Sequence, residues 1–274
     1  MMKKKIVILL VILFLITFMF IIIKPKDDYN INLGNIDNNH KNQLKNVKLE
    51  SRVENLNKYN YKDFFTVGWI QVEGTNIDMP IFTSIFRRLE EKGDISPDFS
   101  YGWRHINYKL GENRMVISAH NIINVSSNPL RNVELLSDFE ALMSFVYHDF
   151  AKNNQYIMYT DENGEESLYV IYSVGFTNPM DEEYYSISYD NKDKLDEYIN
   201  SVKNNSIYNY DVNVNNSDEI ISLITCTRFF GLDGDTLFRV DARKVRENEK
   251  TYKYNVEVNK NYEEISKRLG EEDI

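Results

Sequence analysis

An apolar run near the N-terminus constrains this chain more than any other feature of its sequence. Residues 6–23 are apolar apart from Thr17 and contain no charge. A helix of this length is just long enough to cross the hydrocarbon core of a bilayer. We therefore expect a cytoplasmic stub and a transmembrane helix within residues 1–26. A cleavable signal peptide is the alternative, but no small-x-small cleavage site follows the run.

Charge and cysteine content indicate where the rest of the chain resides. Lysines at positions 3–5 precede the apolar run and favour a cytoplasmic N-terminus. The first 26 residues contain five lysines and no acid, so the remainder carries a net charge of −15 while the whole chain carries −10. An acidic surface of this kind repels nucleic acid. A single cysteine also excludes an internal disulfide and a cysteine-based metal cage. We predict a single-pass membrane protein with an extracellular domain and no nucleic-acid partner.

The chain divides by composition into a main domain with appendages. Its 274 residues suit one domain of ordinary or large size. Residues 27–40 are rich in Asn and Asp and predict a flexible tether, and the apolar spacing in 41–60 predicts a helical lead-in. The main domain occupies 61–246. In the C-terminal extension, 247–274, alternating apolar residues fit either a further strand or an irregular segment. The end of the extension fits a short helix.

Short strands separated by turns dominate the main domain. Pairs of strands are predicted for 69–72 with 77–81, for 156–159 with 167–174, and for 220–225 with 236–245. Residues 114–118 form a further buried strand. Apolar residues at helical spacing predict helices over 192–205 and from Leu135 to Val146. The pattern predicts a mostly β fold, a closed or nearly closed β-barrel with inserted α-helices.

Two residues at strand ends are candidates for chemistry. Cys226 directly follows the strand 220–225, where a buried strand emerges into a loop. A lone cysteine is most often a buried hydrophobe, but an extracellular thiol is a liability without a use, and a nucleophilic thiol needs a nearby cation or base. His120 follows the strand 114–118 in the same way and suits proton transfer, because its ordinary pKa lies near working pH. A hydrogen-bonded structural histidine is the other interpretation.

Arg239 lies on the strand that follows Cys226 across one loop. Alternation places Arg239 on one strand face together with Leu237 and Asp241. If this strand runs beside the cysteine strand, it brings a guanidinium towards the thiol. There the charge favours the thiolate and a developing oxyanion. A solvated arginine on an exposed strand face is the alternative.

Three motifs in order now point to a family. The sequence Val-Ile-Ser-Ala-His-Asn at 116–121, the sequence Ser-Leu-Ile-Thr-Cys at 222–226 and the Arg-bearing strand resemble the signature of sortases, the cysteine transpeptidases of Gram-positive surfaces. Class B is most similar, and the resemblance covers roughly residues 50–246. Ser222 replaces the family's threonine. Leu237 stands where class B chains usually have the catalytic arginine, so that role falls either to Arg239, two residues on, or to Arg228.

The resemblance implies a sortase-like barrel, a reaction and a set of roles. Cys226 is the nucleophile, His120 the general acid and base, and Arg239 stabilises the substrate and the oxyanion. Residues implied in substrate binding are Asn121, Ser222, Thr225 and Arg228. The implied reaction cleaves a C-terminal sorting signal of secreted proteins through a thioester, then transfers the protein to an amine. Neither a metal nor an organic cofactor is required.

Other functions stay open at this point. The acceptor is either a peptidoglycan cross-bridge amine or, in a pilin-polymerising enzyme, a pilin lysine. Residues 84–105 are long for a hairpin connection and are either a substrate-shaping loop or an ordinary surface excursion. A hydrolytic cysteine peptidase of the same geometry is a third interpretation. A non-enzymatic adhesin or receptor ectodomain would hold Cys226 and His120 only as structural residues.

Overall fold

The computed structural model describes most of the main domain and part of the C-terminal extension. It describes residues 46–60, 65–93, 97, 99–105, 113–131, 136, 138–181, 192–231, 236–260 and 262–269. All of them belong to the unit Ile36–Ile274. Within these ranges no helix is long and apolar enough to cross a membrane. The transmembrane helix predicted over 6–23 and the tether predicted over 27–40 lie outside the described residues.

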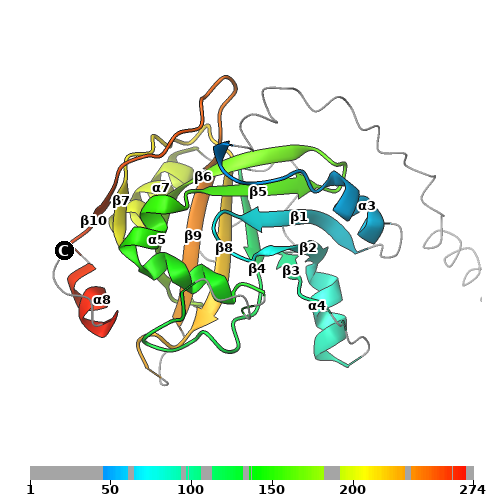
Figure 1. Ribbon diagram of the computed structural model, residues 1–274, viewed down its shortest axis with the longest axis horizontal. Coiled ribbons are helices and arrows are strands. Elements are labelled where there is room, and N and C mark those ends of the chain that lie inside the picture. The colour runs from blue at the N-terminus through cyan, green and yellow to red at the C-terminus, as the bar shows by residue number, and fades with distance from the viewer. Residues whose placement is uncertain are drawn as a thin grey trace, which may run out of the picture. The chain divides into compact units, whose positions relative to one another are not determined.

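Eight strands close into a barrel (Figure 1). They are β1 (Thr66–Val72), β2 (Asp78–Thr83), β3 (Gly102–Arg104), β4 (Arg114–Ser118), β5 (Tyr156–Asp161), β6 (Glu166–Thr177), β8 (Ile220–Thr227) and β9 (Thr236–Lys244). Their order around the barrel is β1-β2-β3-β4-β8-β9-β6-β5, and pairing of β5 with β1 closes it. The predicted mostly β barrel is confirmed.

The three strand pairs predicted from neighbouring segments are all present and antiparallel: β1 with β2, β5 with β6, and β8 with β9. The first turn shows why the sequence folds this way. The Thr75 hydroxyl donates to the Val72 carbonyl at 2.8 Å and accepts from the Ile77 N–H at 3.0 Å. Gly74 has φ 74°, a left-handed conformation that favours glycine. Local hydrogen bonds and one glycine therefore set this hairpin.

Two strand pairs are parallel, β2 with β3 and β4 with β8. The second pair joins segments that lie about a hundred residues apart, with Arg114 opposite Ile220 and Ser118 opposite Ile224. Parallel neighbours end at the same edge of a sheet. This pairing brings the chain that follows β4 and the end of β8 to one edge of the barrel.

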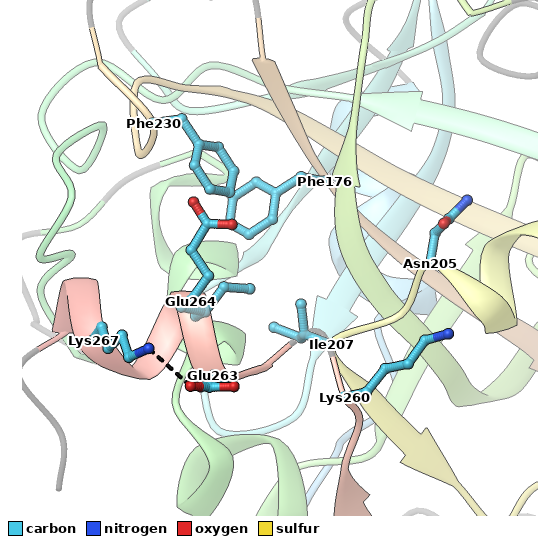
Figure 2. A pocket seen from close by; sticks show the side chains of 9 residues that line it. Phe176, Asn205, Ile207, Phe230, Lys260, Glu263, Glu264 and Lys267 are labelled. Carbon is cyan, nitrogen blue, oxygen red and sulfur yellow. Dashed lines mark hydrogen bonds and ion pairs between the residues drawn. The ribbon is translucent and has the colours of Figure 1, made fainter. Parts of the chain in front are cut away.

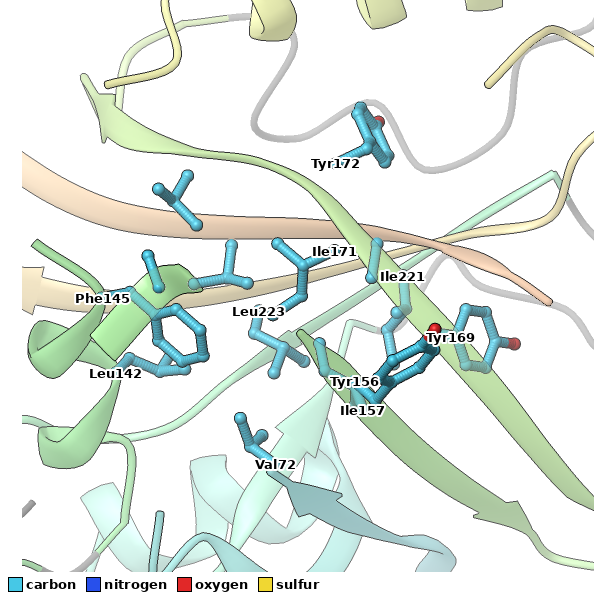
Figure 3. Close-up of a cluster of buried hydrophobic side chains, with 14 of the residues drawn as sticks. Val72, Leu142, Phe145, Tyr156, Ile157, Tyr169, Ile171, Tyr172, Ile221 and Leu223 are labelled. Carbon is cyan, nitrogen blue, oxygen red and sulfur yellow. The ribbon is translucent and has the colours of Figure 1, made fainter. Parts of the chain in front are cut away.

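Apolar side chains from several strands fill the barrel interior (Figure 3). Val72 of β1, Ile157 of β5, Ile171 of β6 and Leu223 of β8 are all at most 2% exposed. Leu142 and Phe145 add to this core from a 3-10 helix, η1 (Glu140–Val146). Because side chains alternate along a strand, the residues of β8 between these core positions, including Ser222 and Ile224, face the other side of the sheet.

Helices cover the outside of the barrel (Figure 1). They are α3 (Val53–Asn60), α4 (Ser84–Glu91), α5 (His148–Asn153) and α7 (Lys192–Asn204). The predicted helix over 192–205 is confirmed, and α7 buries Leu195, Tyr198 and Val202 as its apolar spacing requires. The segment 84–105 contains α4 and β3, so it is a packed part of the domain.

Two predicted helices are compared with the residues that the structure describes. Of the lead-in over 41–60, residues 46–60 are described: Asn46 is helical, Lys48 takes a left-handed φ of 55°, and α3 follows over Val53–Asn60. The helix expected up to Val146 is a 3-10 helix that begins at Glu140. Just before it, Asp138 has a φ of 49° and the Phe139 N–H donates to the His120 carbonyl, so these two residues lie outside the helix.

The C-terminal extension pairs with a short strand and bonds to the barrel. Its strand β10 (Val256–Val258) pairs with β7 (Tyr208–Tyr210), and α8 (Tyr262–Leu269) follows. Lys253 donates to Glu73 of the first hairpin turn at 2.7 Å, and that carboxylate is 3% exposed and also accepts from the Gln155 N–H. The strand and the short helix left open by the sequence are both present.

Candidate active site

The parallel pairing of β4 and β8 brings His120 and Cys226 to neighbouring strand ends. The last registered pair is Ser118 with Ile224. Beyond it, the Ala119 N–H donates to the Ile224 carbonyl at 3.4 Å, and the Thr225 hydroxyl donates to the Ala119 carbonyl at 2.9 Å. The residues that follow Ala119 and Thr225 are His120 and Cys226. The two candidates from distant parts of the sequence are therefore adjacent in register.

Asn121 fixes the chain after His120 against the end of β8. Its side-chain amide donates to the Cys226 carbonyl at 2.9 Å and to the Asn124 carbonyl at 3.1 Å, and its oxygen accepts from the Asn124 N–H at 3.0 Å. The buried carboxylate of Glu140 accepts from the N–H groups of Ile122 and Ile123 at 3.0 and 2.9 Å. These bonds make the loop after His120 a rigid support for Cys226.

Cys226 itself is exposed, whereas the other residues of β8 are buried. The exposed position makes its sulfur accessible to a reagent or substrate. Arg228, two residues on, is also exposed, and its backbone N–H donates to the Val125 carbonyl at 2.8 Å. The chain leaving β8 is thus held to the same loop as the chain leaving β4.

His120 is half-buried, and its ring lies 5.2 Å from that of Trp103 on β3. Burial lowers the pKa of His120, and the charge of Arg87 on α4 lowers it further, while Glu90 and Glu91 oppose this effect. The imidazole is therefore mainly neutral at pH 7. A neutral imidazole is able to accept a proton from a thiol or an amine.

Arg239 lies on β9 two residue pairs deeper in the sheet than Cys226. Leu237 stands opposite Cys226, and Arg239 stands opposite Ile224. The Arg239 guanidinium is 5% exposed and forms an ion pair with Asp241. Burial opposes the charged form of Arg239, yet Asp241 raises its pKa above the ordinary value. The guanidinium stays charged, and the ion pair holds it beside Asp241.

Asp241 is the centre of a buried polar cluster beneath α7. Its carboxylate accepts from the hydroxyls of Tyr198 and Ser222, both at 2.6 Å, as well as from Arg239. The Ser222 hydroxyl accepts in turn from the Arg114 Nε at 2.9 Å. Ser222 is 0% exposed and Thr225 2%, so two residues predicted to bind substrate have hydroxyls occupied within the fold.

Several residues of this region were not singled out from the sequence. Trp103 and Arg87 lie in the segment 84–105, whose length and whose content of charged and aromatic residues were its only signals. Glu140 is an acid in an apolar stretch, which indicates a buried partner but not which one. Asp241 shares a strand face with Arg239, and that alternation was the one available sign of their ion pair.

A pocket of about 570 Å³ lies at the C-terminal extension (Figure 2). The α8 residues Glu263 and Glu264 line it together with Phe176 of β6 and Phe230. Phe230 is the fourth residue after Cys226, so the pocket is continuous in sequence with the end of β8. Among the described residues, no group of three or more His, Cys, Asp or Glu side chains is arranged to hold a metal ion.

Comparison with known proteins shows similarity to sortase B in both sequence and structure. The chain is 26% identical to sortase B of Staphylococcus aureus over 183 residues, which cover 63% of the chain and 66% of the relative, slightly less than two thirds. Sortase B of Clostridium perfringens superposes with a TM-score of 0.53 at 22% identity, covering 71% of this chain and 98% of that one. The chain has the fold of a class B sortase.

A second solved structure agrees. The Staphylococcus aureus sortase B–substrate complex superposes with a TM-score of 0.56 at 18% identity and covers 75% of this chain and 91% of that one. No protein-family model matches the chain. The predicted resemblance to sortases, with class B most similar, is confirmed. At these identities the likeness to solved structures establishes the fold, and the chemistry has to be argued from the site residues.

Proposed function

We propose that this chain is a sortase-type cysteine transpeptidase that attaches secreted proteins to peptidoglycan. The observation that carries the proposal is the β4–β8 register, which supports Cys226 and His120 as neighbours at one barrel edge. Cys226 is exposed and His120 is mainly neutral at pH 7, so the pair suits nucleophilic catalysis with a general base. The substrate would be the C-terminal sorting signal of a secreted protein.

In the first step, neutral His120 takes the thiol proton and the Cys226 sulfur attacks the substrate carbonyl carbon. The S–C bond forms, the C–N bond breaks, and His120 passes the proton to the leaving amine. The product is a thioester on Cys226. Backbone N–H groups near Cys226 would stabilise the oxyanion that develops during the attack.

In the second step, an amine attacks the thioester carbonyl. The new N–C bond forms while the C–S bond breaks, and His120 accepts the proton that the amine loses. His120 then passes that proton to the departing sulfur, which restores the Cys226 thiol and the neutral imidazole and completes the cycle. A peptidoglycan cross-bridge amine is the proposed acceptor, and a pilin lysine is the alternative.

The role of Arg239 in holding the substrate or the oxyanion stays a prediction, because its guanidinium is buried with Asp241. Arg228 is exposed two residues after Cys226 and is the matched alternative. Replacing each arginine by Ala separates the two roles. Loss of the arginine that contacts the substrate lowers the rate of thioester formation per folded molecule, whereas loss of the other arginine leaves that rate near the parent value.

The proposal includes the location of the protein. Residues 6–23 would anchor it as a single-pass membrane protein with its N-terminus in the cytoplasm, and the barrel would lie outside the cell. Protease treatment of intact cells would then degrade the barrel. Protection of the barrel under those conditions would contradict this location.

Product analysis tests the proposed reaction. Purified protein is incubated with peptides of different sorting signals, with and without a soluble amine. We expect a peptide–amine conjugate whose yield rises with amine, and we expect Cys226→Ala and His120→Ala to form almost none. If the peptide is only hydrolysed, to the same extent with and without the amine, the protein would instead be a peptidase. A thiol that reacts with no peptide and no electrophilic substrate mimic would favour a binding ectodomain.

A further inference from the structure

Three charged side chains of α4 lie near His120. They are Arg87, Glu90 and Glu91, and each acts electrostatically on the imidazole. Arg87 also contacts Trp103, which in turn lies beside His120. Its guanidinium carbon lies 5.3 Å from the centre of the Trp103 ring, and that ring lies 5.2 Å from the His120 ring. Trp103 therefore has the arginine and the candidate acid–base group as neighbours.

The position of Arg87 is determined by more than one contact. Its Nη1 donates to Glu90 and its Nη2 pairs with Glu91, both at 3.1 Å. Glu90 is in turn held by the Tyr101 hydroxyl. A guanidinium over an indole is attracted by the ring electrons, so these contacts together hold the guanidinium beside Trp103.

One donor of this guanidinium has no partner. The Arg87 Nε is buried and makes no hydrogen bond with any residue that the structure describes. A buried donor without an acceptor is destabilising. The fold keeps this arrangement beside His120, which is the pattern expected where a side chain serves the site more than the stability of the domain.

We propose that Arg87 is a positioning residue for His120, which fixes Trp103 against the imidazole and places a positive charge where it favours the neutral ring. This inference rests on the proposed function, in which neutral His120 takes the thiol proton. Without the charge, only burial would oppose Glu90 and Glu91, and the balance would shift towards the imidazolium. The base would then be lost at a higher pH.

Other charged groups also surround His120. From the η1 side, Asp138 and Glu140 flank Phe139, whose N–H donates to the His120 carbonyl. The Glu140 carboxylate is bound to the Ile122 and Ile123 N–H groups. From β8, Cys226 is the neighbour in register. All of these remain unchanged in variants of α4, so such variants isolate the effect of the helix.

Titration of His120 by NMR in the full chain tests the charge effect without any substrate. Arg87→Gln is expected to raise the pKa of His120, and Glu91→Gln is expected to lower it. Arg88→Gln removes an exposed charge from the same helix and is expected to leave it unchanged. A His120 pKa in Arg87→Gln equal to that in Arg88→Gln would overturn the proposal.

The rate of thioester formation tests the consequence. In Arg87→Gln, the acid limb of its pH profile is expected to move to higher pH by the same amount as the measured pKa of His120. Arg87→Lys keeps the charge but cannot bond Glu90 and Glu91 through two separate nitrogens while lying over Trp103, so it is expected to restore the limb while leaving a lower plateau rate. If Arg87→Gln fails to fold, Arg87→Lys still decides: a plateau equal to that of the parent chain would contradict the positioning role. Failure of the proposed function is distinct, because the parent chain would then form no thioester at any pH.

Discussion

Ser222 and Cys226 lie four residues apart on one face of β8 and have opposite surroundings. Ser222 is 0% exposed, with its hydroxyl bonded to Asp241 and Arg114 beneath α7. Cys226 is exposed at the strand end, with its backbone carbonyl held by Asn121. The first environment satisfies buried charges within the fold. The second holds the backbone and leaves the residue exposed, and this difference separates residues that stabilise the domain from residues that are placed for chemistry.

The largest expected effect comes from the exposed end of β8. Cys226→Ala should lower the rate of acyl transfer by at least about 10³-fold, because no other thiol is present in the chain. The free energy of unfolding should change by less than about 0.5 kcal/mol, since the side chain is exposed. Enzyme assay and urea unfolding measure the two quantities. Retained turnover would assign the chemistry elsewhere.

Substitution in the buried cluster around Asp241 should change mainly the free energy of unfolding. Asp241→Asn removes the charge that balances Arg239, and breaking a buried ion pair costs about 3–5 kcal/mol of unfolding free energy. Glu219→Gln is the matched control, because its ion pair with Lys244 is exposed, and it should change stability by less than about 1 kcal/mol. Equal losses in the two variants, measured by urea unfolding, would show that burial does not distinguish these sites.

A histidine beside β4 adds a pH dependence to the fold. Burial, and then the charge of Arg114, lower the pKa of His105 to about 4 from the ordinary 6.5, and its ring bonds to the Ser118 hydroxyl at 3.0 Å. The unfolded chain therefore binds this proton first, and stability falls as the pH drops from about 6.5 to about 4, by about 3 kcal/mol. In His105→Asn the loss over this range should be smaller by that amount. Parallel pH–stability curves for the two proteins would contradict the prediction.

Asp138, near the candidate site, should have the smallest effect. Burial raises its pKa to about 6, so the folded chain holds this proton more tightly and stability from this group is lost as the pH rises through 6. Asp138→Asn should gain on the order of 1 kcal/mol at pH 7, allowing for solvent screening, and little at pH 4. Asparagine also tolerates the left-handed φ of 49°. An equal gain at both pH values would indicate a purely conformational cause.

The sequence predicts the local part of this fold well. The antiparallel pairs β1–β2, β5–β6 and β8–β9 follow from alternation and turn residues, because the partners are close in the chain. The pairing of β4 with β8 joins distant segments, and the local pattern of neither strand indicates its partner. The 3-10 form of η1 depends on the left-handed Asp138 and on a bond to His120, neither of which leaves a pattern in the sequence.

The site was predictable to the same extent. Cys226 and His120 stand at strand ends, which the sequence shows directly, and Asn121 follows within the same motif. The surroundings of Arg239 depend on Asp241, Tyr198 and Ser222, which come from three elements and meet only in the folded chain. Trp103 on β3 and Arg87 on α4 lie near His120, and the sequence of 84–105 indicates neither element nor their contact with the histidine. Contacts between distant elements are what a single sequence leaves undetermined.

The most direct test of the central claim is the intact mass of the protein after incubation with a sorting-signal peptide. The account predicts an added mass equal to the acyl fragment, located on Cys226 by peptide mapping and removed when an amine is added. It predicts no such adduct in Cys226→Ala and almost none in His120→Ala. An acyl adduct on another residue, or full acylation of Cys226 in the His120 variant, would contradict the proposed partnership of these two side chains.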